Sequence, residues 1–219
     1  KAAVCAVTSG FEAKKIIQAF KPDVAIGTGG YGSGPVIRKA AQMGVKTLIH
    51  EQNAFPGVTT KLLSKKADVI FLAVEEARKY LPGGRTYQVV GNPVREEILF
   101  THREAARKEL GLRDELCILS YGGSLGARPI NEAVADLMQW HYQSKKIYHV
   151  HSTGKVGHDD FLKMLEKRGV DQKADPNIQV KEYITNMGTY MAAADLIISR
   201  AGAITLSEIE AASKASILI

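Results

Sequence analysis

The sequence is poor in cysteine and has no long apolar run, and each absence excludes a class of protein. It has two cysteines, Cys5 and Cys117, and Cys117 lies in the apolar run LCILSY. A buried thiol in a reducing compartment explains that placement better than a disulfide, so we expect a cytosolic protein. No apolar stretch approaches the roughly 18 to 20 residues that span a bilayer, and the first residues do not resemble a signal peptide, so any membrane contact should be peripheral.

Short repeats and low-complexity tracts are also missing, as is the interleaving of aromatic and basic residues that binds nucleic acid. The chain has 219 residues and is 45% hydrophobic, enough for one sizeable core or two modest ones. Its 29 Lys and Arg residues against 23 Asp and Glu give a net charge of +6. That charge favours acidic partners such as nucleotides, phosphates, nucleic acid or anionic lipid, without choosing among them.

Apolar periodicity alternates between helix and strand along the chain, which predicts an α/β protein with parallel sheets covered by helices. Strands are expected at 23–26, in the run that ends at His50, and at 69–72, 87–90, 116–121, 147–151, 178–180, 196–199 and 215–219. Helices are expected near 11–21, 33–43, 58–66, 103–110, 130–142 and 159–167, after Thr185, and at 204–212. The Asn-Pro pair in GNPVREEI breaks regular structure, so we place a hinge at 92–95 between two domains, 1–94 and 95–219. The strand ends of both domains should face a shared cleft. Because the chain opens without methionine and stops within a strand, we expect an internal fragment with both domains incomplete.

Glycine-rich or polar residues follow several predicted strands, where ligands bind in open α/β sheets. In the first domain these are the loop GTGGYGSGP and the tetrapeptide HEQN. In the second, the loop at 122–127 (GGSLGA) has glycines that let a ligand approach the backbone, Ser124 as a hydroxyl donor and a helix start that favours phosphate. It matches neither the dinucleotide nor the P-loop pattern, and a tight turn without ligand explains it about equally well.

A second candidate element is SRAGAITLSE, in which the small residues after Arg200 open a helix near an anion and Glu208 is in reach of ligand hydroxyls such as a ribose diol. Ordinary helix capping is the alternative. His50 and Glu51 could supply a general base, or could hydrogen-bond loop backbone.

The remaining histidines and the lysines carry weaker signals. His149 and His151 share one strand face, but without a third ligand at suitable spacing they are better explained as structural than as a metal site. His102, His141 and His158 are expected to face solvent. Basic charge gathers in the first half of the chain and forms either a solvated face or a surface for anions: Lys14, Lys15, Lys21, Lys61, Lys65 and Lys66.

Six motifs, GTGGYGSGP, HEQNAFPGVTTKLL, GNPVR, GGSLGA, EYITNM and SRAGAITLSE, together resemble in order and spacing the MurG family, the undecaprenyldiphospho-muramoylpentapeptide β-N-acetylglucosaminyltransferases of bacterial cell-wall synthesis. The resemblance implies a GT-B-like fold of two Rossmann-like domains, with the donor mainly in the second and the lipid acceptor at the first. It implies inverting transfer of N-acetylglucosamine from UDP-N-acetylglucosamine to lipid I, giving lipid II. Peripheral binding to the anionic inner-membrane surface, at the cytoplasmic face of the cell membrane, is also implied.

Residue roles carry over from the same motifs. The donor should contact Asn53, Arg95 and Ser124, with Ile184 meeting uracil and Glu208 the ribose hydroxyls. The rest of the donor-lining segment is Ala203, Ile204, Thr205, Leu206 and Ser207, and the loop expected at the acceptor diphosphate contains Gly29, Gly30, Tyr31, Ser33 and Gly34. No acidic DxD-like metal site is present, and we expect no cofactor and no nucleic-acid partner.

The chain departs from the family pattern at four places. A glycine loop with a histidine should precede Lys1, and a glutamine-bearing donor segment should follow Ile219. Leu125 stands where glutamine is common, and Thr60 where asparagine is common. We therefore expect the isolated chain to be inactive. Two alternatives stay open: another two-domain sugar-nucleotide enzyme such as a UDP-sugar epimerase, or a fragment that binds donor without turnover.

Overall fold

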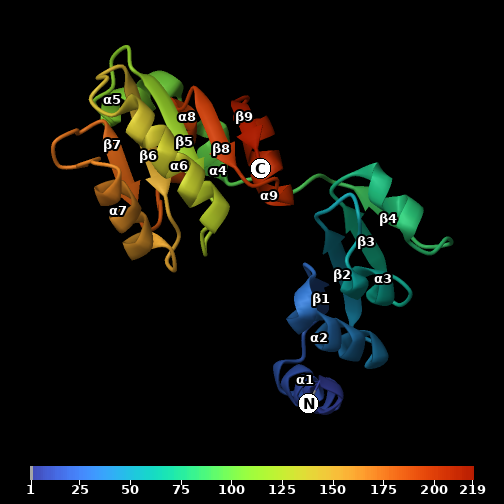
Figure 1. The fold of residues 1–219 in the computed structure, drawn as a ribbon. Coiled ribbons are helices and arrows are strands. Elements are labelled where there is room, and N and C mark those ends of the chain that lie inside the picture. The colour runs from blue at the N-terminus through green and yellow to red at the C-terminus, as the bar shows by residue number, and fades with distance from the viewer. Residues whose placement is uncertain (1) are drawn as a thin grey trace. The chain divides into compact units, whose positions relative to one another are not determined.

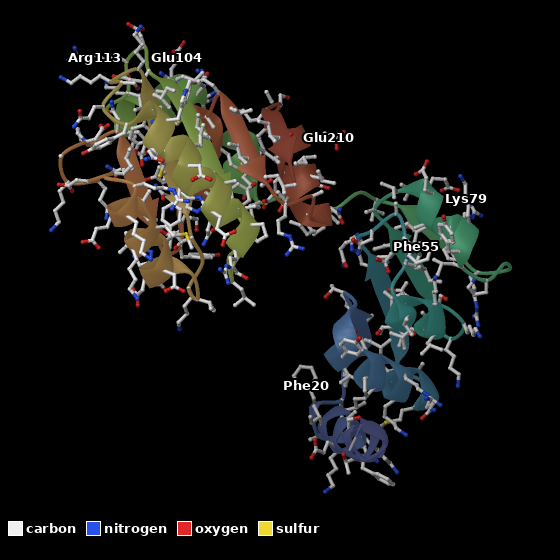
Figure 2. The ribbon with its side chains drawn as sticks, viewed as in Figure 1. Phe20, Phe55, Lys79, Glu104, Arg113 and Glu210 are labelled. Atoms are coloured by element: carbon white, nitrogen blue, oxygen red, sulfur yellow. The ribbon has the colours of Figure 1, made fainter. Side chains whose placement is uncertain are left out.

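The computed structural model describes residues 2–219, with side chains from residue 8 onward, and divides the chain into two compact units between Asn92 and Pro93 (Figure 1). Each unit has its own packed side chains, drawn in Figure 2. Cys5 lies outside the residues whose side chains are described, whereas Cys117 is fully buried as expected. Burial raises the pKa of the Cys117 thiol to about 11, so this thiol is unreactive.

The first unit is a four-stranded parallel sheet in the order β1-β2-β3-β4. Its core joins α2 and α3 to the sheet through apolar side chains such as Ile37, Leu63 and Ile70. In chain order its elements are α1 (Ala2–Phe20), β1 (Val24–Gly27), α2 (Gly30–Gln42), β2 (Lys46–Glu51), α3 (Val58–Leu63), β3 (Val69–Leu72), the 3-10 helix η1 (Glu75–Tyr80) and β4 (Tyr87–Val89).

The second unit is a five-stranded parallel sheet in the order β7-β6-β5-β8-β9. Cys117, Leu119 and Tyr121 of β5 belong to one core and share one face of the sheet, because successive side chains of a strand point to opposite faces. Leu119 packs with the cluster that contains Tyr190 and Ile209, and a second cluster joins α6 and α7 through Val134 and Phe161. The elements are α4 (Glu96–Phe100), α5 (Arg103–Glu109), β5 (Leu116–Tyr121), α6 (Arg128–His141), β6 (Ile147–Ser152), α7 (His158–Lys167), β7 (Ile178–Lys181), α8 (Met187–Ala193), β8 (Leu196–Ser199), α9 (Ala203–Ala211) and β9 (Ala215–Leu218).

The predicted fold class, α/β with two Rossmann-like parallel sheets, is confirmed. The sequence interpretation missed α4 and η1, since helices of five and six residues are too short to display a helical period. It was wrong about His141, which is 3% exposed. Ile130, Val134 and Met138 are spaced along α6 so that His141 continues their apolar face, and this spacing was readable in the sequence.

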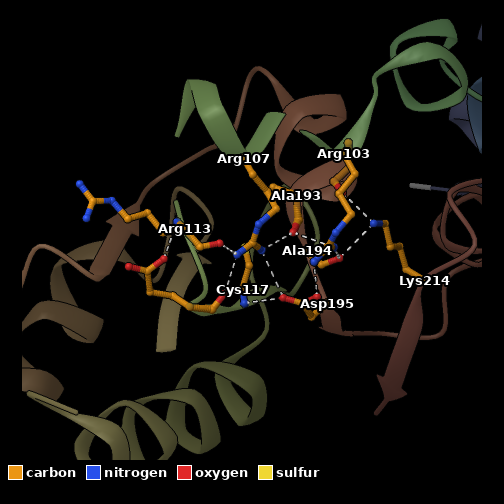
Figure 3. Close-up of polar contacts among 10 residues, drawn as sticks. Arg103, Arg107, Arg113, Cys117, Ala193, Ala194, Asp195 and Lys214 are labelled. Atoms are coloured by element: carbon orange, nitrogen blue, oxygen red, sulfur yellow. Dashed lines mark hydrogen bonds and ion pairs between the residues drawn. The ribbon is translucent and has the colours of Figure 1, made fainter. Parts of the chain in front are cut away.

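A polar cluster holds α5, α8 and β9 to the edge of the second sheet where its strands begin (Figure 3). Asp195 accepts a hydrogen bond from the Cys117 amide at 2.8 Å and pairs with Arg103 at 2.5 Å. Lys214 Nζ donates to the carbonyls of Ala192 and Ala194, near the end of α8, at 2.7 and 3.0 Å. Burial acts to raise the pKa of Asp195, but the hydrogen bonds from the Cys117 amide and Arg103 outweigh it and the pKa is lowered. The cluster therefore stabilises the fold at neutral pH.

Candidate functional site

Two of the loops singled out in the sequence meet at the switch point of the second sheet. β5 and β8 are neighbours, with Tyr121 opposite Ser199 at the ends of the strands. From β5 the chain builds outward through β6 and β7, and from β8 through β9, so the connections after these two strands lead in opposite directions. Ligands of open α/β sheets bind at such a point. The loops at 122–127 and 200–202 thus flank one place on the sheet.

Gly122 and Gly126 of the loop at 122–127 could not be replaced by another residue without movement of the loop. A Cβ at Gly122 would lie 2.4 Å from the Ala127 amide, so the loop turns back tightly on itself. Gly126 has φ +81°, a conformation that favours glycine. Ser124 is exposed at the tip, and no side chain among the described residues caps the first turn of α6. Backbone N–H groups and the positive end of the helix dipole are therefore available to an anion.

A third loop, after β6, supports the glycine loop and was missed in the sequence. A Cβ on Gly126 would lie 2.1 Å from the Thr153 carbonyl oxygen, and one on Gly154 would lie 2.1 Å from the Gly126 amide. The two loops are therefore in backbone contact. The available signal was the polar stretch STG at the end of the strand at 147–151, which is the same kind of strand end that marked the other loops.

The loop after β8 leads into α9, which carries Glu208 on its buried side. Glu208 is 7% exposed, and its Oε1 accepts a hydrogen bond from Arg95 Nε at 2.9 Å. Arg95 also pairs with Glu97 at 3.2 Å. Burial acts to lower the pKa of Arg95, but the hydrogen bond and charge of Glu208 outweigh it and the pKa is raised. Arg95 and Glu208, both selected from sequence motifs, are thus direct partners.

The remaining candidate residues of the second unit differ in exposure. Ile204 and Leu206 are each 38% exposed, and Ala203, Thr205 and Ser207 are half-buried. Ser207 Oγ donates to the Ala203 carbonyl at 3.1 Å, which commits its hydrogen to the helix backbone. Ile184 is 2% exposed and packs in the core. Its side chain is therefore not presented to solvent.

In the first unit the glycine-rich stretch spans the turn after β1 and the first turn of α2, because this helix begins at Gly30 and not near Ser33 as the sequence predicted. Gly29 and Gly30 have φ of +87° and +76°, and Ser33 Oγ donates to the Gly29 carbonyl at 2.7 Å. Tyr31 is 96% exposed. A Cβ on Gly34 would lie 3.3 Å from the Thr59 methyl group, so this glycine allows α2 and α3 to approach closely. The loop is a tight turn whose tip is open to solvent.

The tetrapeptide HEQN at the end of β2 is bound into neighbouring loops. His50 Nε2 donates to the Gly91 carbonyl at 2.9 Å, because that oxygen can only accept, and Gln52 Nε2 lies 3.1 Å from His50 Nδ1. Gln52 Nε2 also lies 3.0 Å from the Thr28 carbonyl, which ties HEQN to the glycine loop. Both ring nitrogens of His50 therefore have partners.

Glu51 is the centre of a smaller network in the same stretch. Its Oε1 accepts from the backbone and side-chain nitrogens of Asn53, each at 3.0 Å, and its Oε2 accepts from the Gly57 amide at 3.2 Å. Burial acts to raise the pKa of Glu51, but hydrogen bonds from Thr60, Asn53 and Gly57 outweigh it and the pKa is lowered. Thr60, the departure from the family pattern, thus contributes to holding this carboxylate. A carboxylate with several donors is a weak base.

His149 and His151 are both fully buried and both lie 2.8 Å from Ser120 Oγ. The described residues contain no group of three His, Cys, Asp or Glu side chains arranged to hold a metal ion. These two histidines belong to the interior of the unit. His102 is exposed and His158 is half-buried.

Comparison with known proteins gives two matching family models. The Glycosyltransferase family 28 N-terminal domain matches residues 1–72, and the Glycosyltransferase family 28 C-terminal domain matches residues 117–219. Relatives in Acetivibrio thermocellus and Desulforamulus reducens are 46% and 43% identical, each over 95% of this chain. Both are named UDP-N-acetylglucosamine–N-acetylmuramyl-(pentapeptide) pyrophosphoryl-undecaprenol N-acetylglucosamine transferase. The chain spans 55% and 56% of their lengths.

Solved structures agree on the fold. The crystal structure of Acinetobacter baumannii MurG is 28% identical, with a TM-score of 0.65 over all of this chain and 58% of the other. A Staphylococcus aureus MnaA–UDP co-structure has a TM-score of 0.71 over all of this chain and 64% of the other. Its identity is 15%, so this second likeness shows the fold alone.

Proposed function

We propose that this chain, which belongs to glycosyltransferase family 28, is part of an inverting transferase that moves N-acetylglucosamine from UDP-N-acetylglucosamine to undecaprenyl-pyrophosphoryl-N-acetylmuramoyl-pentapeptide (lipid I) and forms lipid II. The observation that carries the proposal is the meeting of the loops at 122–127 and 200–202 at one switch point, with Glu208 on the helix that follows. Relatives with 46% and 43% identity are named for the same sugar transfer in cell-wall synthesis.

Residues 95–219 bind the donor in this proposal. The diphosphate lies at the loop that contains Ser124, where unpaired N–H groups and the start of α6 stabilise negative charge. Glu208 accepts hydrogen bonds from the ribose hydroxyls while Arg95 holds its other side. Ile184 meets uracil through its main chain, since its side chain is buried. Ala203, Ile204, Thr205, Leu206 and Ser207 line the sugar and phosphate.

The N–H groups of the loop at 122–127 also contribute to the sugar transfer. When the bond between the sugar and the diphosphate breaks, charge develops on the departing UDP, and N–H groups already aimed at that position stabilise it without rearrangement. The acceptor hydroxyl attacks the opposite face of the sugar, which inverts its configuration, and the proton of that hydroxyl is released to solvent. The chain's own contribution is therefore donor orientation and leaving-group stabilisation.

Residues 1–94 are proposed to meet the acceptor. The segment at the start of α2 that contains Gly29, Gly30, Tyr31, Ser33 and Gly34 is assigned to the acceptor diphosphate, and Asn53 is assigned to contact with the donor. We assign His50 and Glu51 to holding this loop rather than to accepting a proton, because both are occupied by hydrogen bonds to loop groups.

We propose peripheral binding at the cytoplasmic face of the cell membrane, through α1. Phe11, Ile16 and Phe20 are 68%, 63% and 79% exposed, and Figure 2 shows Phe20 near the end of this helix. Ile17 lies on the same helix but is buried within the unit, so it is not part of the proposed membrane contact. The exposed Lys14, Lys15 and Lys21 supply attraction to anionic lipid. No helix among residues 2–219 has the length and apolar character needed to cross a bilayer.

Two measurements test the proposal. Calorimetry with this chain should give saturable binding of UDP-N-acetylglucosamine and none of ADP-glucose, which serves as the control for base recognition. A chimera in which these 219 residues replace the matched part of the Acetivibrio thermocellus relative should transfer labelled N-acetylglucosamine to lipid I. Conversion of the donor without acceptor would instead indicate an epimerase, and no donor binding would contradict the proposal.

A further inference from the structure

Buried side chains on β5, β6 and α6 form one continuous chain of hydrogen bonds in the second unit. His141 Nε2 lies 3.0 Å from His149 Nδ1, and His149 Nε2 lies 2.8 Å from Ser120 Oγ. Ser120 Oγ also lies 2.8 Å from His151 Nδ1. All four residues are at most 3% exposed, so solvent does not compete for these contacts.

The chain continues from His151 to the loop that supports the glycine loop. His151 Nε2 lies 3.2 Å from Asn131 Oδ1, and Asn131 Nδ2 donates to the Thr153 carbonyl oxygen at 3.2 Å. Asn131 is 3% exposed and lies in the first turns of α6. It therefore links the histidines to the backbone on which Gly126 rests.

Asn131 is oriented by the Thr153 carbonyl oxygen. That oxygen can only accept, so the amide nitrogen of Asn131 faces Thr153 and its oxygen faces His151. On the other side of the ring, His151 Nδ1 lies 2.8 Å from Ser120 Oγ and 3.1 Å from the Ser120 carbonyl oxygen. Both ring nitrogens of His151 therefore have oxygen partners, and the ring joins β5 to the start of α6.

We propose that Asn131 is a positioning residue: anchored by the buried histidine chain, it holds Thr153 and Gly154 so that Gly126 and its loop fit the donor diphosphate. This inference rests on the proposed function for the identity of the ligand. The contact between Gly126 and Thr153 leaves no space for a methyl group, so a displaced Thr153 carbonyl moves the glycine loop. Burial lowers the pKa of His141, His149 and His151, which keeps the rings uncharged at neutral pH.

The substitution Asn131→Asp tests the role, because it keeps the shape and removes the N–H donor facing Thr153. We expect binding of UDP to this chain to weaken about tenfold, while binding of uridine, which has no phosphate, changes less than twofold. The control Asn177→Asp makes the same charge change at the half-buried residue before β7 and should leave both affinities unchanged. Unchanged UDP affinity, or an equal loss for UDP and uridine, would overturn the positioning role.

Asn131→Ala provides a second test that introduces no charge. It also removes the amide that faces Thr153, so we expect binding of UDP to weaken while binding of uridine changes less than twofold. Unchanged UDP affinity in this variant would likewise contradict the positioning role. If the unaltered chain binds neither uridine nor UDP, the proposed function fails; normal UDP binding by Asn131→Asp would contradict only the inference.

Discussion

Arg95 Nε lies 2.9 Å from Glu208 Oε1, and this ion pair joins two residues that are 113 positions apart in the chain. Arg95 follows the boundary between the two units, and Glu208 lies on α9. The pair fixes the carboxylate from one side. Its remaining oxygen is the group that we assign to the donor ribose.

Replacing Glu208 by alanine should weaken binding of UDP-N-acetylglucosamine by about 1.5 to 3 kcal/mol, the range for hydrogen bonds to a charged group. Calorimetry with the purified chain measures the change. Glu210→Ala, an exposed carboxylate on the same helix, is the matched control and should bind normally. Equal affinities for the Glu208→Ala variant and the unaltered chain would remove Glu208 from the donor site.

Replacing Arg95 by leucine should weaken donor binding through Glu208 rather than independently of it. Without Arg95, the buried carboxylate of Glu208 turns toward other hydrogen-bond donors. The effects of Arg95→Leu and Glu208→Ala on affinity for UDP-N-acetylglucosamine should therefore couple by about 0.5 to 3 kcal/mol in a double-mutant cycle. Arg78→Leu removes an exposed arginine of the first unit that pairs with Glu75 at 3.2 Å and serves as the control. Strict additivity of the Arg95 and Glu208 effects would show that the ion pair does not orient the carboxylate.

Gly126→Ala should destabilise the second unit and abolish binding of UDP, because the new methyl group would lie 2.1 Å from the Thr153 oxygen. Gly123→Ala is the comparison, because it introduces backbone strain without a steric clash. Gly123 also has a positive φ, +92°, but a Cβ there meets nothing within 4 Å. We expect Gly123→Ala to cost about 1 kcal/mol in the free energy of unfolding and Gly126→Ala clearly more. Chemical denaturation measures both. Similar costs for the two variants would mean that the loop contact is not tight in solution.

Acid should destabilise the second unit through its buried histidines. The pKa of His151 is about 4 in the folded chain against 6.5 ordinarily, so its contribution is complete above pH 6.5 and is lost as the pH falls from 6.5 toward 4. At 1.36 kcal/mol per pKa unit, His151 alone should remove about 2 kcal/mol between pH 7 and pH 5. Denaturation at the two pH values tests this, with His102→Gln, at an exposed site, as the control. Burial also lowers the pKa of His149 and His141, so protonation of these rings in acid should destabilise the unit as well. The negative charge of Asp175 raises the pKa of His141 and so reduces the contribution of that ring. Equal stability at pH 7 and pH 5 would contradict burial of neutral rings.

Reversing the charge of Lys14, Lys15 and Lys21 to glutamate should weaken sedimentation of the chain with anionic phospholipid vesicles. Each lysine near such a surface contributes about 1 kcal/mol, and salt should reduce the difference. Reversal of Lys163, Lys167 and Lys173, which are exposed in the second unit, is the control. Vesicle binding that is unaltered by the first set of changes, at low and high salt, would exclude α1 as the membrane contact.

Much of the fold was readable from local patterns. The strands Val69–Leu72, Leu116–Tyr121 and Leu196–Ser199 have the predicted bounds, because short apolar runs bounded by polar or turn residues are typical of strands in a parallel sheet. The short α4 and η1 were missed, and His141 was placed in solvent although its helical spacing put it with buried neighbours. These errors arise where a segment is too short for a period, or where a polar residue type was given more weight than the period.

The sequence by itself determined the elements, the glycine loops after the strands and the motifs that indicate the family, because these depend on residue type and spacing over a few positions. Only the tertiary structure decided that β5 and β8 are neighbours, that Arg95 reaches Glu208, and that Asn131 joins His151 to Thr153. Strand order and buried hydrogen bonds between distant segments depend on how the helices and strands pack. No local pattern encodes which strand end will lie beside which, so the shared place of the two loops became visible only in the folded sheet.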